Sequence, residues 1–137
     1  MNPLTVEIAD RIATVKEYRT LRSSVGWAVP DSMKCRAALN GSLFGVVALH
    51  DDATIGMARI VGDAEIYCTI VDVVVRQDLR GHGVGRQIMD RLVEWSSTHN
   101  ILHVGLVADD HIADYYAKWG FQPSGRYLRL AAPTPAR

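Results

Sequence analysis

Residues 71–86 read VDVVVRQDLRGHGVGR, and this segment indicates the architecture of the whole chain. It begins inside an apolar run over residues 66–75 that is rich in β-branched side chains, which predicts a central strand buried on both faces. Glycine then occupies every second position from 81 to 85, directly before a helical pattern. At such a turn the backbone N–H groups point outward from a helix N-terminus, where the peptide dipoles place partial positive charge. The segment therefore predicts a phosphate-binding loop, and a turn that only starts the helix is the plainer alternative.

Two other nucleotide-binding patterns do not fit this loop. A P-loop requires Lys and then Ser or Thr after its glycines, whereas Gly85 is followed by Arg86 and Gln87. A dinucleotide fingerprint requires Gly-x-Gly-x-x-Gly in a tight turn directly after the strand, whereas residues 76–79 lie between the strand and the glycines here. Arg80 and Arg86 flank the loop and add positive charge to it.

The pattern downstream of the loop predicts a helix, a strand and further short elements. Apolar residues recur at helical spacing at positions 84, 88, 92 and 95, and residues 101–107 follow as a strand. We expect Asp109 or Asp110 to cap a short helix that ends before Gly120. The residues from 121 onward and residues 127–130 are expected to supply one or two closing strands.

Upstream of the loop, a strand, two helices and an antiparallel hairpin are predicted. Residues 4–9 alternate as a short strand, and Asp10 is expected to cap a helix that runs to residue 24. A second helix opens at residues 30–31 and runs through residue 39. Residues 43–50 and 53–61 flank a turn and form the hairpin. This order of elements predicts a mixed α/β domain with one right-handed crossover between parallel strands.

Composition restricts the class of protein. The chain has 137 residues, of which 48% are hydrophobic, and this suits one domain, expected over residues 1–132 with a short tail at 133–137. A net charge of zero removes the usual electrostatic basis for binding nucleic acid or an anionic membrane. No apolar stretch is long enough to span a bilayer and the start lacks a signal-peptide pattern, so a cytoplasmic location is expected. Cys35 and Cys68 form no Cys-x-x-Cys pair and are expected to be reduced thiols.

Two segments carry a family resemblance. Residues 80–85, RGHGVG, resemble the (Gln or Arg)-x-x-Gly-x-(Gly or Ala) motif of the GNAT superfamily of acyl-CoA-dependent N-acetyltransferases. Residues 114–121, DYYAKWGF, resemble a second segment of that family, at the correct separation from the first. Segments further upstream show a weaker resemblance to the branch of the family that includes plant plastid enzymes acetylating arylalkylamines and proteins. Gln77 departs from the family pattern, which often has Pro at this position.

The resemblance implies a fold and a coenzyme site. The fold would be a mixed, mostly antiparallel α/β (α+β) sheet, flanked by helices, whose central parallel strands splay apart. The pantetheine arm of acetyl-CoA would pair with the backbone of Val73, Val74 and Val75. Its pyrophosphate would rest on the loop residues, and Tyr115 would also contact the coenzyme. The loop residues in question are Arg80, Gly81, His82, Gly83, Val84, Gly85 and Arg86.

The resemblance also implies a direct transfer, with acetyl-CoA as co-substrate and a primary amine as acceptor. Tyr116 lies where the family places the phenol that protonates the leaving thiolate. The alternative is that Tyr115 and Tyr116 only pack the short helix. A backbone N–H within residues 73–75 would polarise the thioester carbonyl.

The base that takes the amine proton is less clear from the sequence. Asp72 interrupts an apolar strand beside the expected acetyl position, so it is a candidate base, and Glu65 is the fallback. A purely structural Asp72, hydrogen-bonded to its neighbours, is equally consistent with the sequence. Trp27 is expected to shape the acceptor pocket, with core packing as the alternative, and Arg59 could pair with Asp63.

Other functions remain open. The acceptor is expected to be a small molecule, but a protein amine is an alternative, and so is a non-catalytic acyl-CoA-binding regulatory domain. Exposed sheet edges also leave a homodimer open. The histidines show no metal-binding spacing, and no metal site is predicted; they are His50, His82, His99, His103 and His111.

Overall fold

The computed structural model describes residues 4–131 and contains one five-stranded sheet in the order β1-β2-β3-β4-β5. Every neighbouring pair is antiparallel except β4 and β5, which are parallel. The mixed, mostly antiparallel sheet expected from the sequence is confirmed. The strands are β1 (Glu7–Ala9), β2 (Phe44–His50), β3 (Ala53–Gly62), β4 (Tyr67–Val75) and β5 (His103–Leu106).

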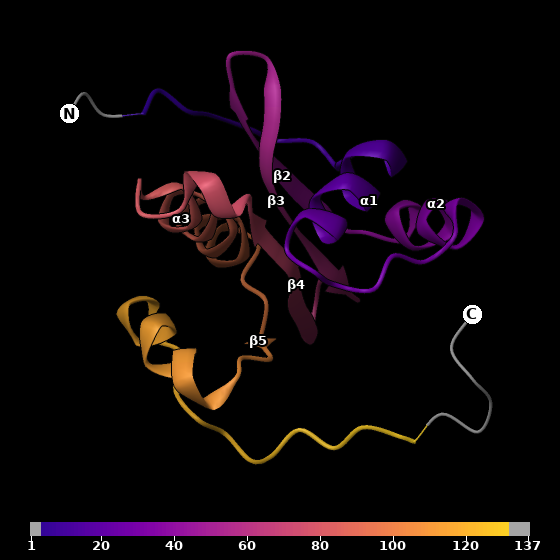
Figure 1. Ribbon diagram of the computed structural model, residues 1–137. Helices are drawn as coiled ribbons and strands as arrows, with labels where there is room; N and C mark the ends of the chain where they lie inside the picture. Colours follow the sequence, from indigo (N-terminus) through magenta and orange to yellow (C-terminus); the bar gives the residue numbers. More distant parts are fainter. Residues whose placement is uncertain (1–3, 132–137) are drawn as a thin grey trace.

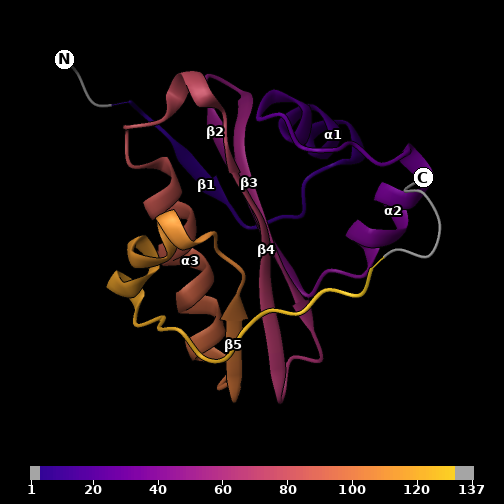
Figure 2. The same ribbon diagram turned by 60° about the horizontal axis from the view of Figure 1, so that its bottom comes forward.

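Helices cover both faces of this sheet (Figure 1, Figure 2). On one face lie α1 (Val15–Ser24) and α2 (Ser32–Asn40). On the other lie α3 (Val84–Thr98) and the 3-10 segment η2 (Asp110–Trp119), and a short turn, η1 (Gln77–Leu79), precedes the glycine loop. Side chains alternate along a strand, so β2 serves both layers: Val46 packs with the α3 core, and Val47 packs with the core under α1 and α2.

The predicted hairpin and the long helix are confirmed. Asp51 and Asp52 connect β2 to β3 with φ angles of 49° and 64°. Two consecutive left-handed residues give a turn whose twist matches that of the flanking strands. In α3, the buried side chains Val84, Ile88 and Leu92 lie one turn apart, as their spacing predicts.

The predicted cap of α1 is wrong. The Thr14 hydroxyl accepts the N–H of Glu17 at 3.2 Å, and the Glu17 carboxylate accepts the N–H of Thr14 at 2.8 Å. This reciprocal capping box satisfies two free amides at once, so the helix begins four residues later than Asp10 would allow. Asp10 instead accepts a hydrogen bond from Arg91 of α3 at 2.7 Å, and that bond lowers the pKa of Asp10.

The predicted closing strands are also wrong, since no strand follows β5 in the part of the chain that the structure describes. Pro123 lacks an N–H, and Gly125 turns the backbone with φ = 77°. Leu128 and Leu130 are 82% and 89% exposed, so their apolar side chains do not pack on the sheet. The helix expected before Gly120 is a 3-10 segment, and Asp109 makes no side-chain capping bond to it.

The remaining expectations about the chain as a whole concern its tail and its helices. The expected tail at residues 133–137 lies outside the described residues. Of the helices between residues 4 and 131, none has the length and apolar character needed to cross a bilayer. Cys35 and Cys68 are both buried, with free thiols.

Candidate functional site

Strands β4 and β5 separate beside the glycine loop. Their pairing runs from Tyr67 opposite His103 to Ile70 opposite Leu106. There β5 ends, whereas β4 continues to Val75. On its β5 side, the backbone of residues 71–75 therefore has no strand partner within the described chain. An extended ligand with amide groups could pair with this open edge as an added strand would.

A bulge in β4 lies at the point where the strands separate. Met57 of β3 pairs with Val74 and Arg59 pairs with Val71, so Asp72 and Val73 together face Ala58. Asp72 adopts φ = 57°, a conformation that is costly for a residue other than glycine. A bulge bends its strand and redirects the side chains around it.

The glycine loop leads from this open edge into α3. Gly81 and Gly83 have φ angles of 84° and 77°, and nothing lies within 4 Å of the position that a Cβ would take at either residue. Gly83 caps α3 without a side-chain hydrogen bond, so the first amides of the helix have no side-chain acceptor from the cap. A phosphate group could approach these amides without meeting a side chain.

The predicted coenzyme residues differ in what they expose. Arg80, His82 and Arg86 have exposed side chains at the loop. Val84 is 2% exposed and packs in the core, so it can offer a ligand only its backbone. In β4, Val74 packs with the core under α1 and α2, whereas its two neighbours, 73 and 75, pack against the α3 core.

The two motifs meet in space, although about thirty residues separate them. A Cβ at Gly85 would lie 3.7 Å from the Tyr115 hydroxyl and 3.9 Å from Val75 Cγ2. The indole N–H of Trp119 donates a hydrogen bond to Asp90 of α3 at 2.7 Å. These contacts fix η2 beside the loop and the end of β4.

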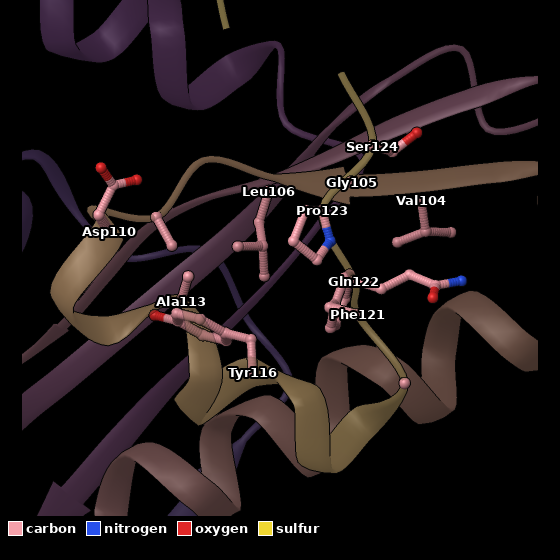
Figure 3. A pocket seen from close by; sticks show the side chains of 12 residues that line it. Val104, Gly105, Leu106, Asp110, Ala113, Tyr116, Phe121, Gln122, Pro123 and Ser124 are labelled. Carbon is pink, nitrogen blue, oxygen red and sulfur yellow. The ribbon is translucent and has the colours of Figure 1, made fainter. Parts of the chain in front are cut away.

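Tyr116 lines a cavity of about 450 Å³ between β5 and η2 (Figure 3). Its ring meets those of Tyr115 and Phe121 edge to face, at centroid distances of 5.2 and 6.5 Å. Burial, with a smaller contribution from Tyr115, raises the pKa of Tyr116 above its ordinary value of 10.0. The phenol is therefore protonated at neutral pH. Within residues 4–131 its hydroxyl makes no hydrogen bond, so it is free to donate one to a ligand.

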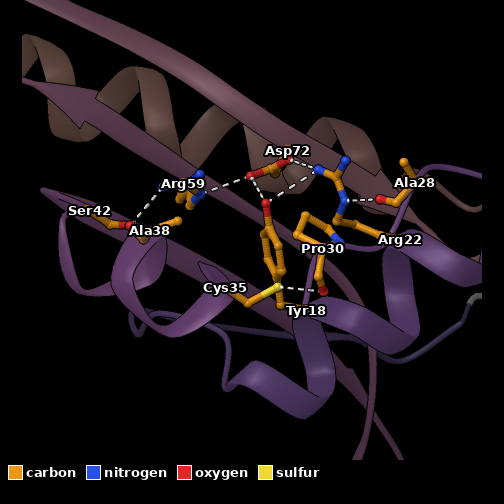
Figure 4. Close-up of polar contacts among 9 residues, drawn as sticks. All are labelled: Tyr18, Arg22, Ala28, Pro30, Cys35, Ala38, Ser42, Arg59 and Asp72. Atoms are coloured by element: carbon orange, nitrogen blue, oxygen red, sulfur yellow. Dashed lines mark hydrogen bonds and ion pairs between the residues drawn. The ribbon is translucent and has the colours of Figure 1, made fainter. Parts of the chain in front are cut away.

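On the other face of the sheet, Asp72 is the centre of a polar network (Figure 4). Its Oδ1 accepts a hydrogen bond from Arg22 Nη1, and its Oδ2 accepts bonds from Arg59 Nε and the Tyr18 hydroxyl, each at 2.8 Å. Burial and the Asp72 carboxylate raise the pKa of Tyr18, so this phenol stays a donor. The network joins α1 to the bulge in β4.

Trp27 stands at the edge of this network. Its ring is 43% exposed, and the Arg22 guanidinium carbon lies 5.4 Å from the ring centroid. An exposed aromatic face beside a cation is a suitable wall for a small organic acceptor.

The predicted pairing of Arg59 with Asp63 is wrong. Arg59 pairs with Asp72, and Asp63 accepts the N–H groups of Glu65, Ile66 and Tyr67 in the turn before β4. Glu65 lies in that same turn, at the end of β4 opposite the glycine loop. The structure therefore does not bring Glu65 to the open edge of the sheet.

Inspection of the sequence missed Tyr18 and Arg22. They lie 54 and 50 residues before Asp72, and neither belongs to a recognised motif. The one available signal is their spacing of four residues on a helix, which puts both side chains on one face. Among the described residues, no group of three or more His, Cys, Asp or Glu side chains is arranged to hold a metal ion.

Comparison with known proteins gives a consistent result. A family model described as an acetyltransferase (GNAT) domain matches residues 41–123. An N-acetyltransferase named ycf52-like, from Prochlorococcus marinus, is 33% identical over 115 residues, which cover 80% of this chain and 64% of that protein. Serotonin N-acetyltransferase 2, chloroplastic, from Oryza sativa is 31% identical over 103 residues, covering 71% of this chain and 50% of that protein.

A solved structure extends the comparison to the whole fold. The probable acetyltransferase SA2161 from Staphylococcus aureus superposes with a TM-score of 0.81 at 28% identity, covering 92% of this chain and all of that one. The first curated relatives are longer than this chain, which spans between 60% and 64% of their length.

Proposed function

Because the chain belongs to the GNAT acetyltransferase family, we propose that it transfers the acetyl group of acetyl-CoA directly to a primary amine of a small molecule. The open edge of β4 carries this proposal. It lies next to a glycine loop with free helix amides, and Tyr115 of η2, the neighbour of Tyr116, reaches the same place beside Gly85.

The chain's own groups suit acetyl-CoA as co-substrate. Backbone groups of Val73, Val74 and Val75 would pair with the amides of the pantetheine arm. The space above Gly81 and Gly83 would admit the diphosphate, which the amides at the start of α3 and the exposed guanidinium groups of the loop would bind. Tyr115 would close the site at Gly85.

In the reaction, the amine nitrogen attacks the carbonyl carbon, the C–N bond forms and the C–S bond breaks. An N–H within residues 73–75 would donate to the carbonyl oxygen as negative charge develops on it. The departing thiolate, whose parent thiol has a pKa of about 8.5, would take its proton from Tyr116.

The acceptor amine must lose a proton before or during the attack. Asp72 stays our prediction for the base, because it directly precedes the residues expected to hold the thioester. Both of its oxygens already accept hydrogen bonds, so a water molecule between the amine and the carboxylate is the route that we propose for this proton.

A small acceptor is supported by the side of the sheet that carries α1 and α2. There the partly exposed Trp27 lies against Arg22 beside the Asp72 network, so an aromatic ring and a few charged side chains lie together, as they do at sites for small molecules. The rice relative is named for serotonin, a small molecule, and this name supports a small-molecule acceptor over a protein here.

A thiol-release assay tests this function. Purified protein, acetyl-CoA and a panel of small amines should release free CoA together with N-acetylated product. Peptides with a free N-terminus or a lysine form the second arm of the panel. Turnover of the peptides alone would replace the small-molecule proposal with a protein acceptor. Acetyl-CoA binding without turnover of any amine would leave a non-catalytic acyl-CoA-binding domain.

One sheet with a core on each face supports a single domain over residues 1–132. The outer edge of β5 has no strand partner among the described residues, which supports a homodimer. A cytoplasmic location stays a prediction from sequence.

A further inference from the structure

The network around Asp72 is not electrically balanced. Two guanidinium groups, those of Arg22 and Arg59, each lie 2.8 Å from the one carboxylate of Asp72. Within residues 4–131, neither guanidinium forms an ion pair with any second carboxylate. The cluster therefore carries one positive charge in excess.

This excess charge lies in a partly desolvated place. The side chains of Arg22, Arg59 and Asp72 are only 19%, 14% and 9% exposed. A net charge at low exposure is unfavourable unless a counter-charge reaches it. The site thus favours the entry of an anion.

Each guanidinium also keeps one free edge, namely its Nη2 amino group. Arg22 uses Nε for Ala28 O and Nη1 for Asp72 and Tyr18, while Arg59 uses Nε for Asp72 and Nη1 for Ala38 O and Ser42 Oγ. In the described chain no partner is found for either Nη2. No fully buried side-chain nitrogen or oxygen there lacks a partner, so neither Nη2 atom is fully buried.

Arg22 is the better placed of the two to meet a ligand. Arg59 lies between Asp72 and the end of α2 and is the less exposed (Figure 4). Arg22 stacks against Trp27, which is 43% exposed, so its guanidinium lies beside a side chain that solvent reaches. Arg59 balances Asp72, and the charge of Arg22 remains for a ligand.

We propose that the acceptor is a small amine that also carries an anionic group, and that this group binds the free edge of Arg22. The inference rests on the function proposed above, because it names the class of acceptor for that site. A carboxylate and a phosphate share the chemistry that fits, since Nη2 can donate a charge-assisted hydrogen bond to an anionic oxygen of either group. Arg59 is then a positioning residue, and Asp72, besides its proposed part in proton transfer, holds Arg22 beside the expected thioester.

The test uses pairs of acceptors that differ only in the anionic group. Each aminoalkyl carboxylic acid is compared with its carboxamide, and aminoethyl benzoic acid with its benzamide. The amine is kept far from the carboxyl group in each compound, so that the two members of a pair have the same degree of amine protonation. Aminoethyl phosphate against ethanolamine forms the phosphate arm. Loss of one charge-assisted hydrogen bond costs about tenfold or more, so the wild type should prefer the acid over the amide in kcat/KM by at least about that factor.

Variants show whether Arg22 is the origin of this preference. Arg22→Gln should remove it and act equally on acid and amide, and Arg22→Lys should restore part of it because the charge returns in a different geometry. Arg36→Gln is the matched control, since Arg36 is exposed on α2, and it should keep the full preference. A residue that only ties α1 to β4 would lower the turnover of both acceptors alike.

The results separate the two proposals. If neutral amines are acetylated as well as acids, or if Arg22→Gln retains the preference, the inference is overturned and the transferase function stands. If no amine of any charge releases thiol, the function fails and the inference fails with it. If Arg22→Gln does not fold, the wild type is measured at rising ionic strength, and the ratio of kcat/KM for acid to that for amide tests the inference. Salt should reduce a preference that is electrostatic and leave a preference of any other origin unchanged.

Discussion

The indole N–H of Trp119 donates a 2.7 Å hydrogen bond to the carboxylate of Asp90 and so fastens η2 to the first half of α3. This bond holds η2 against α3, although the two bonded residues are 29 positions apart in the sequence. The tyrosines of η2 are held beside the loop from which α3 begins, and the position of Tyr116 depends on this attachment.

Asp90→Ala should loosen η2 without disturbing the sheet. A hydrogen bond to a charged group contributes about 1.5 to 3 kcal/mol, so backbone amides of residues 110–119 should exchange with solvent about tenfold faster or more. Glu94→Ala is the control, because Glu94 lies one turn further along α3 with a side chain that is 72% exposed. Hydrogen exchange followed by mass spectrometry measures both. Equal exchange of η2 in the two variants would show that this bond does not hold the segment.

Tyr116→Phe should slow turnover while leaving the coenzyme bound. General acid catalysis contributes about a hundredfold or more, and kcat should fall by that order, whereas the dissociation constant for acetyl-CoA should not change. Tyr67→Phe, at the 62% exposed start of β4, serves as control. Steady-state kinetics and calorimetry supply the two readouts. An unchanged kcat would remove Tyr116 from the reaction.

The pH dependence of kcat follows from the same residue. A donor must be protonated, and burial raises the pKa of Tyr116 above its ordinary value of 10.0, so the range in which it can donate extends upward. Loss of the Tyr116 proton should therefore lower kcat only with a midpoint above pH 10.0. A pH–rate profile of wild type and Tyr116→Phe checks this. The account is contradicted by an alkaline decline with a midpoint below pH 10.0 that is present in the wild type and absent in the variant.

Gly83→Ala should weaken acetyl-CoA binding specifically. Both Gly83 and Gly26 have left-handed backbones, with φ angles of 77° and 79°, and a Cβ would meet nothing within 4 Å at either position. Alanine at each should therefore cost a similar 1 to 2 kcal/mol, about the strain of a left-handed residue. Only the Cβ at residue 83 would stand in the expected path of the diphosphate. Affinity for acetyl-CoA, measured by calorimetry, should fall in Gly83→Ala and hold in Gly26→Ala; an equal effect would place the diphosphate elsewhere.

The parts of the fold that the sequence predicts well are those that local forces determine. Two examples are the helix α3, with its periodic apolar residues, and the hairpin turn at Asp51 and Asp52. The conformation of each depends on neighbours within a few residues, so the local sequence predicts it. Asp10 is a chemically reasonable N-cap. However, Thr14 and Glu17 form a capping box that satisfies two backbone amides, and the helix therefore begins after Thr14.

The parts that sequence could not predict depend on distant contacts. Tyr127, Leu128 and Leu130 have the composition of a strand, but no strand partner reaches them within the described chain, so their side chains stay exposed. The sequence alone shows Asp72 as an unusual carboxylate in an apolar strand. Its partners on α1 lie 50 and 54 residues away, and only the folded sheet brings them within hydrogen-bonding distance.

A crystal structure of the protein with acetyl-CoA tests the central claim most directly. The account predicts that the coenzyme diphosphate accepts hydrogen bonds from amides of residues 81–85 and that the pantetheine amides pair with the backbone of residues 73–75, which puts the thioester carbonyl within reach of a β4 amide and the Tyr116 hydroxyl. A coenzyme bound anywhere else, with the β4 edge still open, would contradict it.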